Sequence, residues 1–241
     1  MSPTPLQIAA QRLALAGKVA VLTGAGISAE SGVPTFRGPG GLWENHRPED
    51  LATPQAFARD PELVWRWYNW RRGLIAGCAP NPAHLALAAL EQRVGDFTLL
   101  TQNVDGLHRL AGSRNLLEVH GNLWMVRCTV CGALYEERGL GLPARPACRQ
   151  CGGLLRPHVV WFGESLDSAI LDRAWRAAAG CQVMLVVGTS AVVQPAAGLA
   201  SVAKQAGAFV IEVNLEPTPN SREVDVSLMG KAGEILPQLV D

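Results

Sequence analysis

The chain has 241 residues, 48% of them hydrophobic, and its 21 Lys and Arg are balanced by 21 Asp and Glu. A chain of this length and hydrophobicity can bury a full core, either as one large domain or as one domain with an insertion. The balanced charge excludes a basic field for a nucleic-acid backbone and an acidic tail for cationic partners, so partners must be recognised locally.

The sequence gives no sign of export. Residues 1–16 lack a basic start followed by an apolar core and a small-residue cleavage site, so no secretion signal is recognisable. The uncharged stretch 177–203 is long enough for a membrane span, but Gly, Gln and Pro residues interrupt it. We interpret this stretch as a buried strand, a tight loop and a helix, and we expect a cytoplasmic protein that does not contact a membrane.

Short apolar runs alternate along the chain with helical patterns. The runs are typical of parallel strands covered on both faces, and they lie at Lys18–Thr23, Phe97–Thr101, Val183–Val187 and Ala208–Ile211. Helices are predicted at Gln7–Leu15, Glu62–Ile75, His84–Arg93, Asp167–Ala178, Ala197–Gln205 and Ala232–Val240. The alternation predicts an α/β fold with a doubly wound parallel sheet.

The first predicted strand ends in a glycine-rich turn. Gly24 and Gly26 at the carboxyl end of the strand would let the backbone approach a pyrophosphate and present N–H groups to it. The next glycine, Gly32, does not fit the dehydrogenase spacing, and no acidic residue ends an evident second strand, so hydride transfer is disfavoured. Phe36 and Arg37 follow and suit a site for a flat ring and a phosphate, although core packing is the alternative for Phe36.

The Trp-rich predicted helix carries two side chains suited to a carboxylate. Tyr68 and Arg71 are three residues apart, so they lie on one helical face. The Arg guanidinium binds a carboxylate through two hydrogen bonds, and a phenol adds a third donor. The alternative, of equal weight on spacing alone, is a solvated Arg71 and a Tyr68 packed among tryptophans. Arg72 at the neighbouring position is a second candidate for the cation.

Two Cys-x-x-Cys pairs, sixteen residues apart, have the spacing of a closed zinc site with four thiolate ligands. The predicted ligands are Cys128, Cys131, Cys148 and Cys151. Four sulfurs fill a tetrahedral shell, so the metal is expected to hold a small module together and not to catalyse. Two disulfides in a secreted protein are the disfavoured alternative.

His120 lies eight residues before the first of these cysteines. An imidazole whose pKa is near neutrality suits a general base, although a lone histidine near a strand end is more often structural. His108 is the competing candidate, and we interpret it as structural. His46, His84 and His158 have no catalytic context in the sequence.

Taken in chain order, these motifs resemble those of the sirtuins, the NAD-dependent protein-lysine deacylases. The matching segments are Gly24–Arg37, Thr101–His108, Val119–Gly121, Cys128–Cys151, Val160–Glu164, Gly188–Ser190 and Asn214 with Glu216. The resemblance covers nearly the whole chain. It implies NAD as co-substrate, one structural zinc ion, and transfer of the acyl group from a protein lysine to ADP-ribose, giving nicotinamide, O-acyl-ADP-ribose and free lysine.

The resemblance also implies roles for single residues. It implies His120 as the general base that takes a proton from a ribose hydroxyl, Asn103 as the residue that orders the ribose and a water, and Asp105 as the contact of the nicotinamide carboxamide. The implied cofactor-binding residues are Gly24, Ala25, Gly26, Ser28, Glu30, Phe36, Arg37, Trp43, Gln102, Asn103, Asp105, Gly188, Thr189, Ser190, Asn214, Glu216 and Ala232. The implied substrate-binding residues are Tyr68, Arg71, Val160 and Phe162.

The pattern Tyr-x-x-Arg resembles the sirtuin subgroup that removes succinyl, malonyl and related acidic acyl groups. We therefore expect an enzyme that acts on acyl-lysine proteins, removes acetyl as well as acidic acyl groups, and favours the acidic ones. A deacetylase without acidic preference and a mono-ADP-ribosyltransferase are the alternatives. The sequence does not determine the oligomeric state and is compatible with a monomer.

The expected division of the chain follows from the resemblance. A Rossmann-like NAD-binding domain is expected over residues 1–44, 80–121 and 165–241. Two insertions, a helical one over 45–79 and a zinc-binding one over 122–164, are expected to form the small domain.

Overall fold

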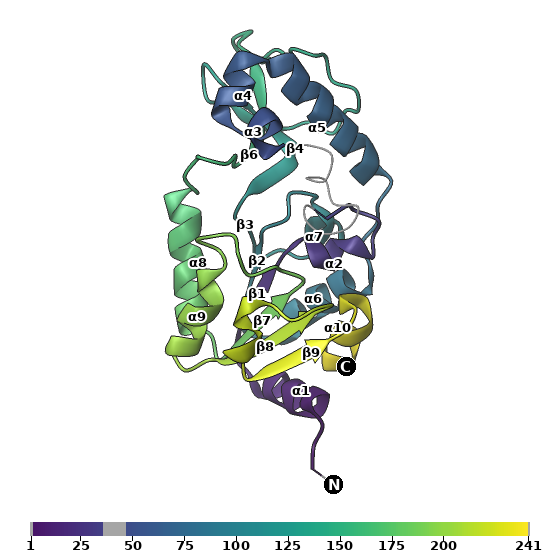
Figure 1. Cartoon of the computed structure of the whole chain (residues 1–241), viewed down its shortest axis with the longest axis vertical. Helices are drawn as coiled ribbons and strands as arrows, with labels where there is room; N and C mark the ends of the chain where they lie inside the picture. Colours follow the sequence, from purple (N-terminus) through teal and green to yellow (C-terminus); the bar gives the residue numbers. More distant parts are fainter. Residues whose placement is uncertain (1, 36–46, 241) are drawn as a thin grey trace.

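The computed structural model describes residues 2–35 and 47–240, which form two β-sheets (Figure 1). The larger sheet has six parallel strands in the order β3-β2-β1-β7-β8-β9. These strands are β3 (Leu116–Glu118), β2 (Asp96–Thr101), β1 (Lys18–Thr23), β7 (Val183–Val187), β8 (Phe209–Asn214) and β9 (Val226–Met229). The predicted parallel sheet is confirmed, and the strand order reverses between β1 and β7.

Helices cover both faces of this sheet (Figure 1). Helices α1 (Pro5–Leu15), α6 (Pro82–Arg93) and α10 (Ala232–Val240) pack on one face, and α8 (Ser168–Gly180) and α9 (Gly198–Gln205) pack on the other. Strand β1 contributes Val19 and Val21 to the first hydrophobic cluster and Ala20 and Leu22 to the second. Successive side chains of a strand alternate between faces, so a strand covered on both faces is hydrophobic throughout.

The two edge strands of the large sheet, β3 and β9, are absent from the sequence prediction. Strand β3 has only three residues, and β9 buries two of its four residues. An edge strand is covered less completely than a central strand, so it needs no continuous apolar run. This is why the hydrophobic pattern indicated the central strands and not the edges.

The smaller sheet is antiparallel, in the order β5-β4-β6, with β4 at Gly121–Cys128, β5 at Leu134–Glu136 and β6 at Leu155–Val159. It shares one hydrophobic cluster with α3 (Pro48–Leu51), α4 (Pro54–Arg59) and the Trp-rich α5 (Pro61–Ala76). Figure 1 shows these elements together at one end of the molecule, as the small domain. The exact division between the domains stays a prediction.

The uncharged stretch 177–203 comprises the end of α8, the whole of β7 and most of α9, as interpreted from the sequence. Over residues 2–35 and 47–240, no helix combines the length and the hydropathy needed to cross a membrane.

Candidate active site

A cavity of about 890 Å³ lies between the carboxyl ends of the large sheet and the small domain. This is where open α/β sheets bind ligands, at the point where the strand order reverses. The cavity is lined by most of the residues implied by the sequence: Gly24, Ala25, Gly26, Tyr68, Arg71, Gln102, Asn103, His120, Val160, Phe162, Gly188, Thr189, Ser190, Asn214 and Glu216. The fold therefore brings together segments from nearly the whole chain.

The glycines at the ends of β1 and β7 lie against each other. A Cβ atom on Gly24 would lie 2.7 Å from the Gly188 oxygen, and one on Gly26 would lie 2.7 Å from the Gly188 Cα. Gly188 has a φ of 59°, in the left-handed region that favours glycine. The glycines thus allow two strand ends to approach each other, in addition to exposing backbone to the cavity.

His120 has the hydrogen bonding of a general base. Its Nδ1 lies 3.1 Å from the Gln102 carbonyl oxygen. Because a carbonyl only accepts, Nδ1 carries the proton, and the lone pair of Nε2 is available. Burial lowers the pKa of His120 below 6.5 and outweighs the Gln102 carbonyl, which raises it. The imidazole is therefore neutral at pH 7 and able to accept a proton.

His108 has a different environment. Its side chain is buried, and its Nε2 lies 3.0 Å from the Thr23 hydroxyl. Burial, with a smaller contribution from His84, lowers the pKa of His108 to about 3. His108 does not line the cavity, which agrees with its interpretation as a structural residue.

A second, smaller cavity adjoins the first and has a polar wall. Ser28, Asn103, Asp105 and Arg71 all line it. The Ser28 hydroxyl donates to Asp105 Oδ2 at 2.8 Å, and Asn103 Nδ2 donates to the Ser28 hydroxyl and to the Gly24 carbonyl, both at 3.0 Å. Burial raises the pKa of Asp105, although the Leu107 N–H and the Ser28 hydroxyl lower it. This network fixes the amide of Asn103 and the carboxyl of Asp105 at the cavity wall.

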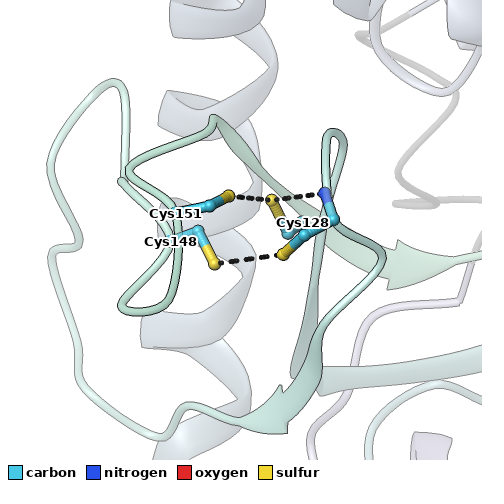
Figure 2. A group of neighbouring side chains, drawn as sticks. Cys128, Cys148 and Cys151 are labelled. Carbon is cyan, nitrogen blue, oxygen red and sulfur yellow. Dashed lines mark hydrogen bonds between the residues drawn. The ribbon is translucent and has the colours of Figure 1, made fainter.

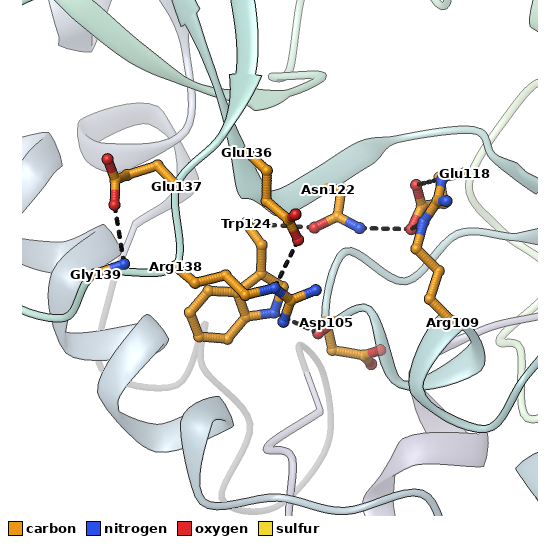
Figure 3. Close-up of polar contacts among 9 residues, drawn as sticks. All are labelled: Asp105, Arg109, Glu118, Asn122, Trp124, Glu136, Glu137, Arg138 and Gly139. Atoms are coloured by element: carbon orange, nitrogen blue, oxygen red, sulfur yellow. Dashed lines mark hydrogen bonds and ion pairs between the residues drawn. The ribbon is translucent and has the colours of Figure 1, made fainter.

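The small domain also holds the Asp105 segment (Figure 3). Trp124, on β4, donates its indole N–H to the Asp105 carbonyl at 2.8 Å. The Asn122 oxygen accepts from the Trp124 backbone N–H at 2.8 Å, and its amide donates to Glu118 at 2.6 Å. Glu118 in turn pairs with Arg109 at 2.7 Å. No sequence pattern indicates these contacts, most of which join residues of different elements.

Tyr68 and Arg71 are buried and line the same cavity as His120. The Arg71 guanidinium lies 4.8 Å from the Trp67 ring centroid and 5.7 Å from that of Tyr68. Only 5% of Arg71 is exposed, so the alternative of a solvated helix face is wrong. Arg72 is also buried, but it lies 5.2 Å from the Trp124 ring and does not line the cavity. Of the two candidates, Arg71 is therefore the one that lines the cavity.

The four paired cysteines form a cluster (Figure 2), and none of them lines the cavity. Their sulfur atoms all lie within 4.8 Å of one another, with 3.5 Å between Cys128 and Cys151 and 3.7 Å between Cys131 and Cys148. A tetrahedral zinc ion with bonds of about 2.3 Å requires such separations, whereas a disulfide requires about 2.05 Å. The four thiolates fit one structural zinc ion and leave no open position.

Among the described residues, two implied cofactor residues line neither cavity. The Glu30 carboxylate accepts from the Gly233 N–H at 2.8 Å and so contacts the first turn of α10. Ala232 is buried at the start of α10. Phe36, Arg37 and Trp43 lie outside the described residues, and so does His46.

Sequence reasoning missed Glu212, in the middle of β8. Its carboxylate is buried and accepts from the hydroxyls of Thr218 and Ser221 at 2.5 Å and of Ser227 at 2.7 Å. It thereby holds the segment 215–219, which lines the cavity beside Asn214. The position of this glutamate within an apolar strand, between Ile211 and Val213, could have identified it. A carboxylate buried there needs several hydrogen-bond donors around it.

The Sir2 family model matches residues 24–195, which is more than half of the chain. The chain belongs to the Sir2 family. It is 55% identical over 236 residues to NAD-dependent protein deacylase 2 of Pyrobaculum aerophilum, covering 96% of this chain and 93% of the relative. It is 54% identical over 224 residues to the NAD-dependent protein deacylase of Aquifex aeolicus, covering 92% and 94% of the two chains.

Solved Sir2 structures agree with this assignment. A Sir2 homologue in complex with NAD is 52% identical, with a TM-score of 0.91 over 96% of this chain and 91% of the other. A complex of Sir2 with a p53 peptide and NAD is 32% identical, with a TM-score of 0.85 over 95% and 94% of the two chains. In this Sir2 chain NAD is the co-substrate, and the four cysteines hold one structural zinc ion.

Proposed function

We propose that this Sir2 chain, an NAD-dependent protein deacylase, removes succinyl and malonyl groups from protein lysines in addition to acetyl groups, and favours the acidic ones. The observation that carries the proposal is the position of Tyr68 and Arg71 on the wall of the cavity that also contains His120. A carboxylate at the end of an acyl chain would meet the guanidinium and the phenol together.

The electrostatics of the site support this preference. Burial is the main influence on both side chains, since it lowers the pKa of Arg71 and raises the pKa of Tyr68. A charge that is removed from water interacts more strongly with a charged ligand than a solvated charge does. A carboxylate gains this interaction as well as hydrogen bonds to ionised donors, whereas a neutral acetyl group gains neither.

The geometry of His120, Asn103 and Asp105 is compatible with the remaining steps of the reaction. Bound NAD supplies an electrophilic ribose carbon when nicotinamide leaves. His120 accepts a proton from a ribose hydroxyl at Nε2, and the Gln102 carbonyl stabilises the imidazolium by accepting from Nδ1. Asn103 and Asp105, fixed through Ser28, orient polar groups of the bound co-substrate. The substrate is a protein segment with an acylated lysine, and a cytoplasmic location stays a prediction.

The test is the double variant Tyr68→Phe with Arg71→Met. We expect kcat/KM for a succinylated peptide to fall about 100-fold, which corresponds to the loss of a charge-assisted pair and one neutral donor, while kcat/KM for the matched acetylated peptide falls much less. Arg66→Met is the matched control, because Arg66 is an exposed cation on the same helix. Equal losses on both peptides indicate general damage and contradict the proposal.

The main alternative is a deacetylase without acidic preference. It predicts that the ratio of desuccinylation to deacetylation is the same in Arg71→Met and in Arg66→Met. A mono-ADP-ribosyltransferase would instead retain the label of radioactive NAD on protein, and the pair of Tyr68 and Arg71 gives that activity no support.

A further inference from the structure

The tryptophan of the loop after β6 contacts the acyl-binding tyrosine directly. Trp161 is buried, lines the cavity, and donates its indole N–H to the Tyr68 hydroxyl oxygen at 2.8 Å. The two residues are 93 positions apart in the sequence. This contact joins the substrate loop to the helix that carries Arg71.

The direction of this hydrogen bond decides what the phenol does. An indole N–H only donates, so the Tyr68 oxygen must accept through a lone pair. Its own O–H is then directed elsewhere, and no side chain or backbone group among the described residues accepts from it. The O–H is therefore free to donate to a ligand in the cavity that Tyr68 and Arg71 both line. Tyr68 is thus held as a hydrogen-bond donor beside a cation.

The indole itself is held from several sides. The Arg156 guanidinium lies 3.5 Å from the centroid of the Trp161 ring, and Phe57 packs 5.2 Å from it. Arg156 forms two hydrogen bonds with the Glu164 carboxylate, at 2.6 and 2.8 Å. Glu164 also accepts from the backbone N–H of Trp161 at 2.8 Å. The ring, the backbone and the indole N–H of Trp161 are therefore all fixed.

Arg156 and Glu164 form an ion pair that is largely shielded from water, since only 8% of Arg156 is exposed. Such a pair contributes little net stability, because desolvation offsets the attraction, but it fixes geometry. Here the ion pair fixes the position of Trp161, and Trp161 in turn fixes the orientation of the Tyr68 hydroxyl.

We propose that Trp161 is a positioning residue that determines the preference for acidic acyl groups. The inference rests on the proposed function, because it presupposes that the Tyr68 hydroxyl donates to an acyl carboxylate. The indole N–H of Trp161 donates to a lone pair of the Tyr68 hydroxyl oxygen. The O–H of Tyr68 is then directed into the cavity as a donor. An acetyl group has no carboxylate for this donor, so the contribution of Trp161 is specific to acidic groups.

The first test is Trp161→Phe, which keeps an aromatic ring beside Arg156 and removes the N–H donor. We expect the ratio of kcat/KM for succinylated over acetylated peptide to fall about 3- to 10-fold, the effect of one hydrogen bond. In a Tyr68→Phe background the same change should leave the ratio unaltered, because the phenol that it orients is gone.

Trp65→Phe is the matched control. The Trp65 indole N–H donates to the Leu155 carbonyl at 2.8 Å in the same hydrophobic cluster, and Trp65 does not line the cavity. This variant loses the same kind of buried hydrogen bond, so it should lower stability without changing the ratio. Glu164→Gln is a second variant, in which the loosened ion pair should lower the ratio in the same direction by a smaller factor.

The outcomes separate the two proposals. If Arg71→Met lowers the ratio and Trp161→Phe does not, the role of Trp161 is overturned and the proposed function stands. An equal fall of the ratio in the wild-type and Tyr68→Phe backgrounds also overturns it, because the effect then bypasses the phenol. If the wild-type protein does not remove succinyl groups, both proposals fail together.

Discussion

The two halves of the cavity wall are built in different ways. One half, which we propose faces the nucleotide, comes from the ends of β1, β2, β7 and β8, and it offers glycines and backbone held by a sheet that is buried on both faces. The other half, which we propose faces the acyl group, comes from α5 and the loop after β6, and it offers large side chains that contact one another. A wall of backbone is insensitive to side-chain substitution, whereas the properties of a wall of side chains can be altered by single substitutions.

The large and small domains also differ in what stabilises them. The large sheet is held by two clusters of apolar side chains, one on each face. The small domain has one cluster with four tryptophans, and the domain also contains the four paired cysteines. The large domain is therefore expected to tolerate loss of the metal better than the small domain.

The largest expected effect is that of His120→Ala, which tests the chemistry shared by both halves. Removing a general base lowers turnover about 100- to 10,000-fold, and the free lysine and nicotinamide released from an acylated peptide measure it. His158→Ala is the control, since His158 is a half-buried histidine outside the cavity lining. Near wild-type release by His120→Ala would exclude His120 as the base.

A smaller effect is expected from Cys131→Ser, which breaks the small domain selectively. Removing one thiolate weakens zinc binding, which contributes directly to folding. We expect the midpoint of thermal unfolding to fall by about 6–12 °C, for a loss of about 3 kcal/mol in a chain of this size. Cys78→Ser, outside the cluster, should change it little. Fully active protein that contains no zinc would refute the site.

Sequence reasoning succeeded where function depends on local pattern. The continuous runs gave the central strands of the parallel sheet, and the spacing of the cysteines gave the zinc site. Gly24 and Gly26 were found because they follow such a run, at the edge where parallel strands end, whereas Gly188 was implied by the family resemblance alone.

Contacts between distant positions could not be predicted in the same way. The spacing of Tyr68 and Arg71 left a solvated guanidinium as an open alternative. The fold instead buries Arg71 and places it with Asn103 and Asp105 around the second cavity. The motif that contains Trp161 was recognised, but nothing in it indicates that the indole N–H meets a side chain of α5. Glu30 does not line the cavity, and its carboxylate accepts from the Gly233 N–H of α10, a contact 203 positions away that no local pattern indicates.

The smallest expected effect concerns pH and the large domain. Burial lowers the pKa of His84 to about 4 and of His108 to about 3, against about 6.5 in the unfolded chain. Below about pH 6.5 the unfolded state therefore binds more protons than the folded state. The free energy of unfolding is highest, with respect to these two histidines, above about pH 6.5 and declines as the pH falls toward about 4. Each pKa unit between the folded and unfolded states contributes at most about 1.4 kcal/mol per histidine to the free energy of unfolding.

His108→Gln should reduce this pH dependence, because glutamine does not titrate. Urea unfolding at pH 7.5 and pH 5 measures it, with zinc loss at low pH common to both proteins and therefore cancelling in the comparison. An unchanged difference between the two pH values would show that His108 does not remain neutral in the folded state.

The most direct measurement of the central claim uses the wild-type protein with paired peptides of one sequence, one succinylated and one acetylated at the same lysine, with and without NAD. The account predicts NAD-dependent release of free lysine from both, with the larger kcat/KM for the succinylated peptide. Release from the acetylated peptide alone would contradict it and would leave a Sir2 deacetylase whose buried Tyr68 and Arg71 serve packing only.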